Sequence, residues 1–245
     1  MKTATDIRKD ARESLTGKWG KGALIALVYA IFSLILNAIE KKFDEELLGS
    51  IISLIVAIIE VPISFGLVIS FMKLKRGEEV GAFDFFKDGF SNFKRAWGLS
   101  WNTFVKMILP VILIVVATII MVMSGVATFF AGEFASSAAG TMSALFPIGV
   151  ILFLVAMVYA VIKGFSYSMS NFIACDNQEM TTKEAVEKSE ELMKGNKGNL
   201  FLLQLSFIGW AVLAIFTLGI GYLWLMAYTQ VATICFYEEL INNND

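Results

Sequence analysis

The chain has 245 residues and a net charge of −2, and 57% of its residues are hydrophobic while only 17% are charged. Soluble domains average roughly 45–50% apolar and about 25% charged residues, so this composition excludes an ordinary soluble domain. With no histidine and only two cysteines, the chain lacks the commonest general base and any cysteine-based metal or disulfide framework. We therefore expect neither an enzyme nor a bound cofactor or metal.

Residues 3–19 predict an interfacial amphipathic helix, and a first membrane span follows at residues 22–39. Thr3 and Asp6 have the spacing of a capping box. Apolar side chains recur every four residues, opposite a basic face, at Ile7, Ala11, Leu15 and Trp19. No small-residue cleavage pattern follows the span, so we expect it to stay in the membrane as an anchor.

A second span is expected at residues 47–72, after a short charged loop. Glu60 lies at about mid-depth in this span, and Pro62 follows it by two residues. A proline lacks the backbone N–H that would bond the carbonyl four residues earlier. Pro62 should therefore free the Ile58 carbonyl and kink the helix.

Residues 73–102 leave the membrane. Within them, residues 82–97 predict the clearest interfacial helix. One face carries residues of both charges, and the other is an aromatic stripe made of Phe86, Phe90, Phe93 and Trp97. A third span is expected at residues 103–125, with Lys106 reaching back to the membrane surface. Residues 127–144 then form either a loop or a short helix on the far surface.

After a fourth span at residues 146–162, a polar segment contains a third amphipathic helix at residues 181–194. Thr181 and Glu184 form its capping box, and Gly195 is placed to end it. Its apolar stripe comprises Ala185, Ser189, Leu192 and Met193. Its other face offers two ion pairs at i,i+4 spacing, namely Glu184–Lys188 and Glu190–Lys194.

The last apolar block, Leu200 to Leu240, is too long for one span, because a single helix would rise about 60 Å against a hydrocarbon core of about 30 Å. Gly219 and Gly221 permit a tight turn near its middle. The block therefore predicts two spans, at residues 200–217 and 221–238. The expected fold is an all-α polytopic membrane bundle of six spans in three hairpins, in a single domain.

The distribution of basic residues predicts the orientation. Eighteen of the 20 lysines and arginines fall on one side of this map, and only Lys41 and Lys42 fall on the other. By the positive-inside rule both termini are cytoplasmic. The basic segments adjoin spans, so we expect anionic lipid headgroups as partners rather than nucleic acid.

A shift of 178 residues aligns Leu15, Gly17 and Gly20 with Met193, Gly195 and Gly198. We interpret this as a repeated unit, an amphipathic helix followed by a hairpin, which occurs three times. The alternative is that junctions of this kind generally contain glycine.

Several strings resemble an integral membrane protein family of Gram-positive bacteria, the domain of unknown function 975. They are IRKDARESL at 7–15, DGFSNFKRAWGL at 88–99, EAVEKSEELMKGNKGNLFLLQLSFIGW at 184–210, LGIGYLW at 218–224 and FYEEL at 236–240. The family pattern favours proline where this chain has Ala227. The resemblance implies a bacterial plasma-membrane location and no assigned reaction.

Glu60 is the sharpest candidate for chemistry, with Gln204 as a second intramembrane polar residue. A carboxylate inside a span costs about 2–3 kcal/mol or more, and is by default a functional hypothesis. The structural alternative is a protonated Glu60 hydrogen-bonded to the freed Ile58 carbonyl or to a neighbouring Ser or Gln. Gln204 and other polar groups of the last block are better explained as hydrogen-bond partners between helices, namely Ser206, Thr229, Gln230 and Thr233.

Three functions are consistent with this pattern. The first is a non-catalytic multi-pass protein acting in envelope maintenance, peptide self-protection or as a partner of another membrane complex. The second is a permease or transporter subunit that uses Glu60. The third, an intramembrane enzyme, is disfavoured because the chain has so few acid–base groups.

Overall fold

The computed structural model describes residues 2–43, 46–131 and 137–243, and all the regular structure in these ranges is helical. The helices, in chain order, are α1 (Ala4–Leu15), α2 (Trp19–Lys42), α3 (Glu46–Arg76), α4 (Asp84–Ser91), α5 (Phe93–Ala131), α6 (Ser137–Tyr167), α7 (Ser170–Asp176), α8 (Thr182–Leu192), α9 (Lys197–Leu205), α10 (Ile208–Phe216) and α11 (Gly221–Asn242).

Within the described ranges, five helical segments are long and apolar enough to cross a membrane. They are Trp19–Lys42, Leu47–Arg76, Phe93–Val126, Leu145–Asp176 and Lys197–Phe216. These segments indicate a membrane-embedded protein. The segment predicted as a sixth span falls on α11 and is not among them, because polar side chains such as Thr229 and Gln230 lower its hydropathy.

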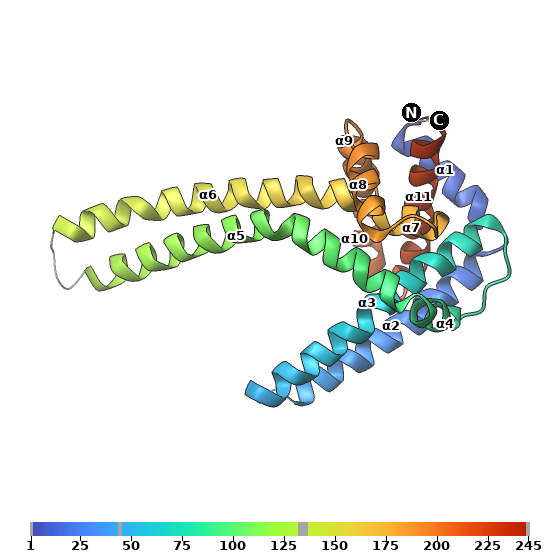
Figure 1. The fold of residues 1–245 in the computed structure, drawn as a ribbon, viewed down its shortest axis with the longest axis horizontal. Coiled ribbons are helices and arrows are strands. Elements are labelled where there is room, and N and C mark those ends of the chain that lie inside the picture. The colour runs from blue at the N-terminus through green and yellow to red at the C-terminus, as the bar shows by residue number, and fades with distance from the viewer. Residues whose placement is uncertain (1, 44–45, 132–136, 244–245) are drawn as a thin grey trace.

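Helices that follow one another in the chain pack in three groups, which we call hairpins: α2 with α3, α5 with α6, and α9 and α10 with α11. In Figure 1 α2–α3 and α5–α6 leave a common body in different directions, and α9–α11 and both ends of the chain lie at that body. The expected bundle of six spans in three hairpins is therefore not confirmed. Residues 127–131 and 137–144 continue α5 and α6 rather than forming a loop or a surface helix, and residues 132–136 lie outside the described ranges.

Small side chains bring α5 and α6 together. Ala117 and Ser124 of α5, and Gly149 and Ala156 of α6, are buried and stand seven residues apart on their helices. A methyl group on Gly149 would lie 3.0 Å from the Met121 backbone nitrogen, so the two backbones approach closely here. Small residues at such spacing are typical of helix pairs packed inside membranes.

Helix α4 packs on the hairpin that precedes it in the chain. Gly66 of α3 lies against the α4 backbone, where an added methyl group would be 2.6 Å from the Gly89 nitrogen. Phe85 is fully buried and meets Tyr29 of α2 edge to face. The predicted helix 82–97 is broken at Asn92, where α4 ends and α5 follows, so its four aromatic side chains do not form one stripe.

Helix α8 likewise packs on the hairpin before it, α5–α6. The Asn102 side-chain amide of α5 donates to Thr182 Oγ1 at 3.1 Å, and Ser189 of α8 donates to the Ser166 carbonyl of α6 at 2.9 Å. Lys163 of α6 and Lys106 of α5 both pair with Glu190, at 3.0 and 3.8 Å. The two predicted i,i+4 pairs are absent from the described ion pairs, because Glu184 caps α8 and Glu190 binds Lys163.

Helix α1 has no hairpin before it and packs instead on the last one, against α9 and α11. The Tyr228 hydroxyl donates to the Arg8 carbonyl at 3.2 Å, and the Lys2 N–H donates to the Glu239 carboxylate at 3.0 Å. The apolar stripes of α1 and α8 are thus buried by the protein itself, with every member at most 3% exposed, at Ile7, Ala11, Leu15, Ala185, Ser189, Leu192 and Met193.

The capping boxes and glycines follow the repeat seen in the sequence. Thr3 with Asp6 and Thr181 with Glu184 form complete capping boxes 178 residues apart. Gly17 and Gly195, at the same offset, both have positive φ, +75° and +79°. The packing does not follow the order of the predicted units, because α4 and α8 pack on the hairpin before them in the chain and α1 packs on the last one.

The C-terminal half of α11 forms the centre of the body, with Val231, Ile234 and Phe236 fully buried. Ala227 packs against Gly22 of α2, and α11 continues through this point as one helix. The chain turns between α10 and α11 at residues 217–220, where Gly219 has a φ of +86°, at the glycines from which the turn was predicted.

Candidate functional site: a charged junction between the hairpins

The charged groups of the body meet where α3 ends. Lys73, Lys75 and Arg76 occupy its last turn, where cations favour the exposed carbonyls and the negative end of the helix dipole. We call these residues and their acidic partners Asp88, Asp176 and Glu238 the charged junction.

Each cation of the charged junction pairs with an acid from another helix. Lys73 pairs with Asp88 of α4 at 2.7 Å. Arg76 makes two hydrogen bonds to Asp176 at the end of α7, at 2.7 and 2.9 Å, in the bidentate geometry that guanidinium groups prefer. Glu238 of α11 pairs with Lys75, and it lies 3.7 Å from Arg76 Nε. The junction therefore joins α3 and α11, which belong to two of the hairpins, with the short helices α4 and α7.

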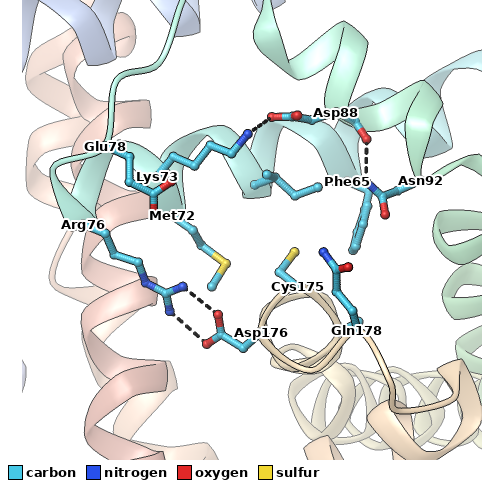
Figure 2. A pocket seen from close by; sticks show the side chains of 12 residues that line it. Phe65, Met72, Lys73, Arg76, Glu78, Asp88, Asn92, Cys175, Asp176 and Gln178 are labelled. Carbon is cyan, nitrogen blue, oxygen red and sulfur yellow. Dashed lines mark hydrogen bonds and ion pairs between the residues drawn. The ribbon is translucent and has the colours of Figure 1, made fainter.

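A cavity of about 340 Å³ lies at the charged junction (Figure 2). Phe65, Met72 and Cys175 line it, and Figure 2 shows Met72 and Cys175 between the Lys73–Asp88 and Arg76–Asp176 pairs. Across the cavity from α3, Arg95 of α5 holds the end of α7 by donating to the carbonyls of Ala174, Asn177 and Gln178 at 2.6–3.0 Å.

The energetics favour a positioning role for the junction. The exposed fraction of its six side chains ranges from 18% to 38%. Ion pairs this accessible contribute only about 0–1 kcal/mol each, so they add little to stability. They do fix the relative orientation of α3, α4, α7 and α11, because each pair requires one specific approach of two helices.

Within the charged junction, all three cations are engaged by carboxylates. Among the described residues there is no cluster of three or more His, Cys, Asp or Glu side chains that could hold a metal ion.

Glu60 lies close to a polar segment of the protein. Pro62, two residues on, has its carbonyl oxygen against Gly89 of α4, and the Ile58 carbonyl accepts a hydrogen bond from the Trp97 indole at 3.3 Å. Two residues of helix rise only about 3 Å, so Glu60 is near the level of α4. The carbonyl freed by Pro62 is therefore bonded by Trp97, and not by Glu60 as the structural alternative supposed.

Glu60 is half-buried and does not line any of five well-formed cavities along the described part of the chain. Gln204 is exposed on α9, and within the described ranges no hydrogen bond joins it to Glu60. The hydroxyls of Ser206, Thr229 and Thr233 donate to carbonyls of their own helices, so these three do not bridge helices as predicted.

The sequence analysis did not single out the charged junction. Lys73 and Arg76 were counted only for orientation, and Asp176 was not noticed. One signal was available, since Glu238 stands at the end of a long apolar run, and an acid in that position needs a cationic partner from elsewhere in the chain.

The chain was also compared with known proteins. The family model described as "Protein of unknown function (DUF975)" matches residues 1–244. No curated protein and no solved structure matches the chain.

Proposed function

The chain belongs to the DUF975 family of proteins of unknown function, and from this premise we propose that it is a non-catalytic, multi-pass protein of the bacterial plasma membrane. It crosses the membrane six times, both termini are cytoplasmic, and the charged junction holds α3, α4, α7 and α11 in register. It works through the membrane as a partner of other membrane components.

The position of the two ends of the chain is the observation that carries this proposal. Lys2 is hydrogen-bonded to Glu239, so the start of the first helix and the end of the last helix lie on the same side of the protein. A chain whose ends share one side crosses a membrane an even number of times. Five segments are apolar enough to cross, and α11 is the remaining long helix. A more polar helix is tolerated as a sixth span where protein surrounds it.

The hairpins diverge in Figure 1, and all three can cross one flat bilayer only if they lie closer to parallel. The α5–α6 hairpin joins the body through short non-helical links at Asn92 and Ser168.

Labelling of single cysteines tests the six crossings. In a background with Cys175 and Cys235 replaced by alanine, a membrane-impermeant maleimide is applied to intact cells carrying Phe43→Cys, Leu218→Cys or Glu13→Cys. Leu218 is 95% exposed at the tip of the α10–α11 turn, so its thiol is accessible. We expect the first two variants to react in intact cells, and Glu13→Cys to react only after lysis. A Leu218→Cys variant that reacts only after lysis would exclude α11 as a span.

A charge exchange tests the positioning role of the junction. Arg76→Asp alone puts two acids side by side and should destabilise the protein in detergent, whereas Arg76→Asp combined with Asp176→Arg restores the pair and should recover much of the loss. The readout is the melting temperature. No recovery in the exchanged protein would mean that Arg76 serves something other than its pairing with Asp176.

The transport alternative receives no support from the geometry of Glu60, because none of the five cavities reaches its carboxylate. We therefore do not extend the proposal to transport.

A further inference from the structure

A second cavity, of about 410 Å³, lies between the α10–α11 hairpin and the junction of α1 with α2. Three of the chain's five tryptophans line it, Trp19, Trp210 and Trp224. Tyr228 is buried behind them, with its ring edge to face with Trp19 at 5.8 Å. We call this cavity the tryptophan groove.

The only charged side chain lining the tryptophan groove is Arg12, at the end of α1. One turn earlier on the same helix, Arg8 donates to the Ser206 carbonyl at 3.4 Å, and its Nε is buried without a hydrogen-bond partner. Within the described ranges neither arginine forms an ion pair with a carboxylate. This contrasts with the charged junction, where all three cations are paired.

The groove also has a direction. It extends from Arg12 and Trp19 along α10 and α11 to Thr217 and Gly221 at the hairpin turn. Tyr228 and Gly221 are seven residues apart on α11, a rise of about 10 Å, or about a third of the thickness of the hydrocarbon core. The tryptophan groove thus has a cationic end at Arg12 and an apolar, aromatic wall along α10 and α11.

We propose that the tryptophan groove binds one anionic phospholipid, with its phosphate at Arg12 and an acyl chain along Trp210 and Trp224. This inference rests on the proposed membrane insertion, because only then does the groove open to lipid. Arg12, which forms no ion pair within the described ranges, supplies the charge complementarity, since guanidinium groups bind phosphate oxygens through two hydrogen bonds. Tryptophan and tyrosine suit the boundary between headgroups and acyl chains.

Quenching of tryptophan fluorescence by brominated lipids tests the proposal on the full-length chain. Trp97→Phe and Trp101→Phe leave only the three tryptophans of the groove. This protein is reconstituted into phosphatidylcholine vesicles that contain a small fraction of either dibromo-phosphatidylglycerol or dibromo-phosphatidylcholine. We expect an about fivefold preference for the anionic lipid, the factor corresponding to one cationic side chain at an anionic surface.

Matched variants identify the residue responsible. Arg12→Gln should remove the preference, and Arg12→Lys should keep part of it. Lys9→Gln is the control, because Lys9 is on the same helix and loses the same charge but is exposed outside the groove, 3.9 Å from Glu13. The control should leave the preference unchanged.

Three results would overturn the inference. Equal quenching by both lipids, or a preference that survives in Arg12→Gln, would mean that Arg12 and the groove do not select an anionic lipid, while membrane insertion stands. Quenching by neither lipid would mean that the groove is not in contact with lipid. Together with labelling that excludes the α11 span, that result would overturn the proposed function as well.

Discussion

Ser189 has a buried hydroxyl that makes two hydrogen bonds at the base of the α5–α6 hairpin. It is fully buried, donates to the Ser166 carbonyl and accepts from the Met169 N–H at 3.1 Å. Ser189→Ala leaves that buried N–H without its acceptor, which typically costs about 1–3 kcal/mol. We expect a lower melting temperature in detergent.

Ser100→Ala is the control for this change, because Ser100 is exposed on α5 and makes no hydrogen bond among those described. If Ser189→Ala melted at the temperature of the parent protein, the bonds to Ser166 and Met169 would be replaceable, for example by water.

Glu190 gives the stability of the same region a pH dependence. The hydrogen bond from the Lys163 ammonium group holds the pKa of Glu190 below its ordinary value of 4.5. A depressed pKa means that this contribution is complete above about pH 4.5 and is lost as the pH falls through the lower pKa of the folded protein. The melting temperatures of the parent and of Glu190→Gln should therefore differ at pH 7 and converge on acidification. A difference that persisted at low pH would show that Glu190 acts by a route other than its charge.

At the scale of single elements, the sequence predicted local features well. The capping boxes at Thr3 and Thr181 and the turn at Gly219 depend on contacts within a few residues, and short motifs encode such contacts. The apolar stripe of α1 was also recognised. The residues that cover this stripe could not be predicted, because an amphipathic pattern is the same whether its apolar side faces lipid or protein. Packing partners more than 200 residues away, such as Tyr228 for Arg8, left no local signal.

The crossing of α4 over α3 depends on two glycines that the sequence analysis passed over. A methyl group on Gly66 would lie 2.6 Å from the Gly89 nitrogen, and a methyl group on Gly89 would lie against the Pro62 carbonyl. Both contacts are to backbone atoms, which cannot rotate away. Gly66→Ala should therefore separate the helices and cost about 1–3 kcal/mol or more. It should also make Lys73 and Asp88 more accessible to solvent, measured by hydrogen exchange across α4.

Gly20→Ala is the matched control, because nothing lies within 4 Å of the added methyl group and alanine favours a helix by about 1 kcal/mol over glycine. This variant should melt at the parent temperature or above it. If Gly66→Ala were equally harmless, α4 would not rest on α3 as closely as the structure shows.

At the scale of the whole molecule, each hairpin carries one amphipathic helix, and α1 completes the last hairpin. This arrangement predicts that the protein can fold without the covalent link between α1 and α2. A circular permutant that begins at Lys18, with residues 2–17 joined by a short linker after residue 243, should fold, because both ends lie together and Gly17 is exposed.

Deletion of residues 2–17 is the comparison, and it should be far less stable, since it uncovers the core that Ile7, Ala11 and Leu15 fill. Size-exclusion profiles and melting temperatures in detergent distinguish the two proteins. A permutant that aggregates like the deletion would show that α1 must remain attached to α2.

The pairing of α1 with the last hairpin also has a consequence for biosynthesis. Arg8 emerges from the ribosome 220 residues before Tyr228, so α1 has to wait, without its final partners, while the intervening helices are synthesised. An amphipathic helix can rest on the bilayer surface during such an interval. In the finished protein, the stripe of Ile7, Ala11 and Leu15 is buried where α1 packs against α9 and α11.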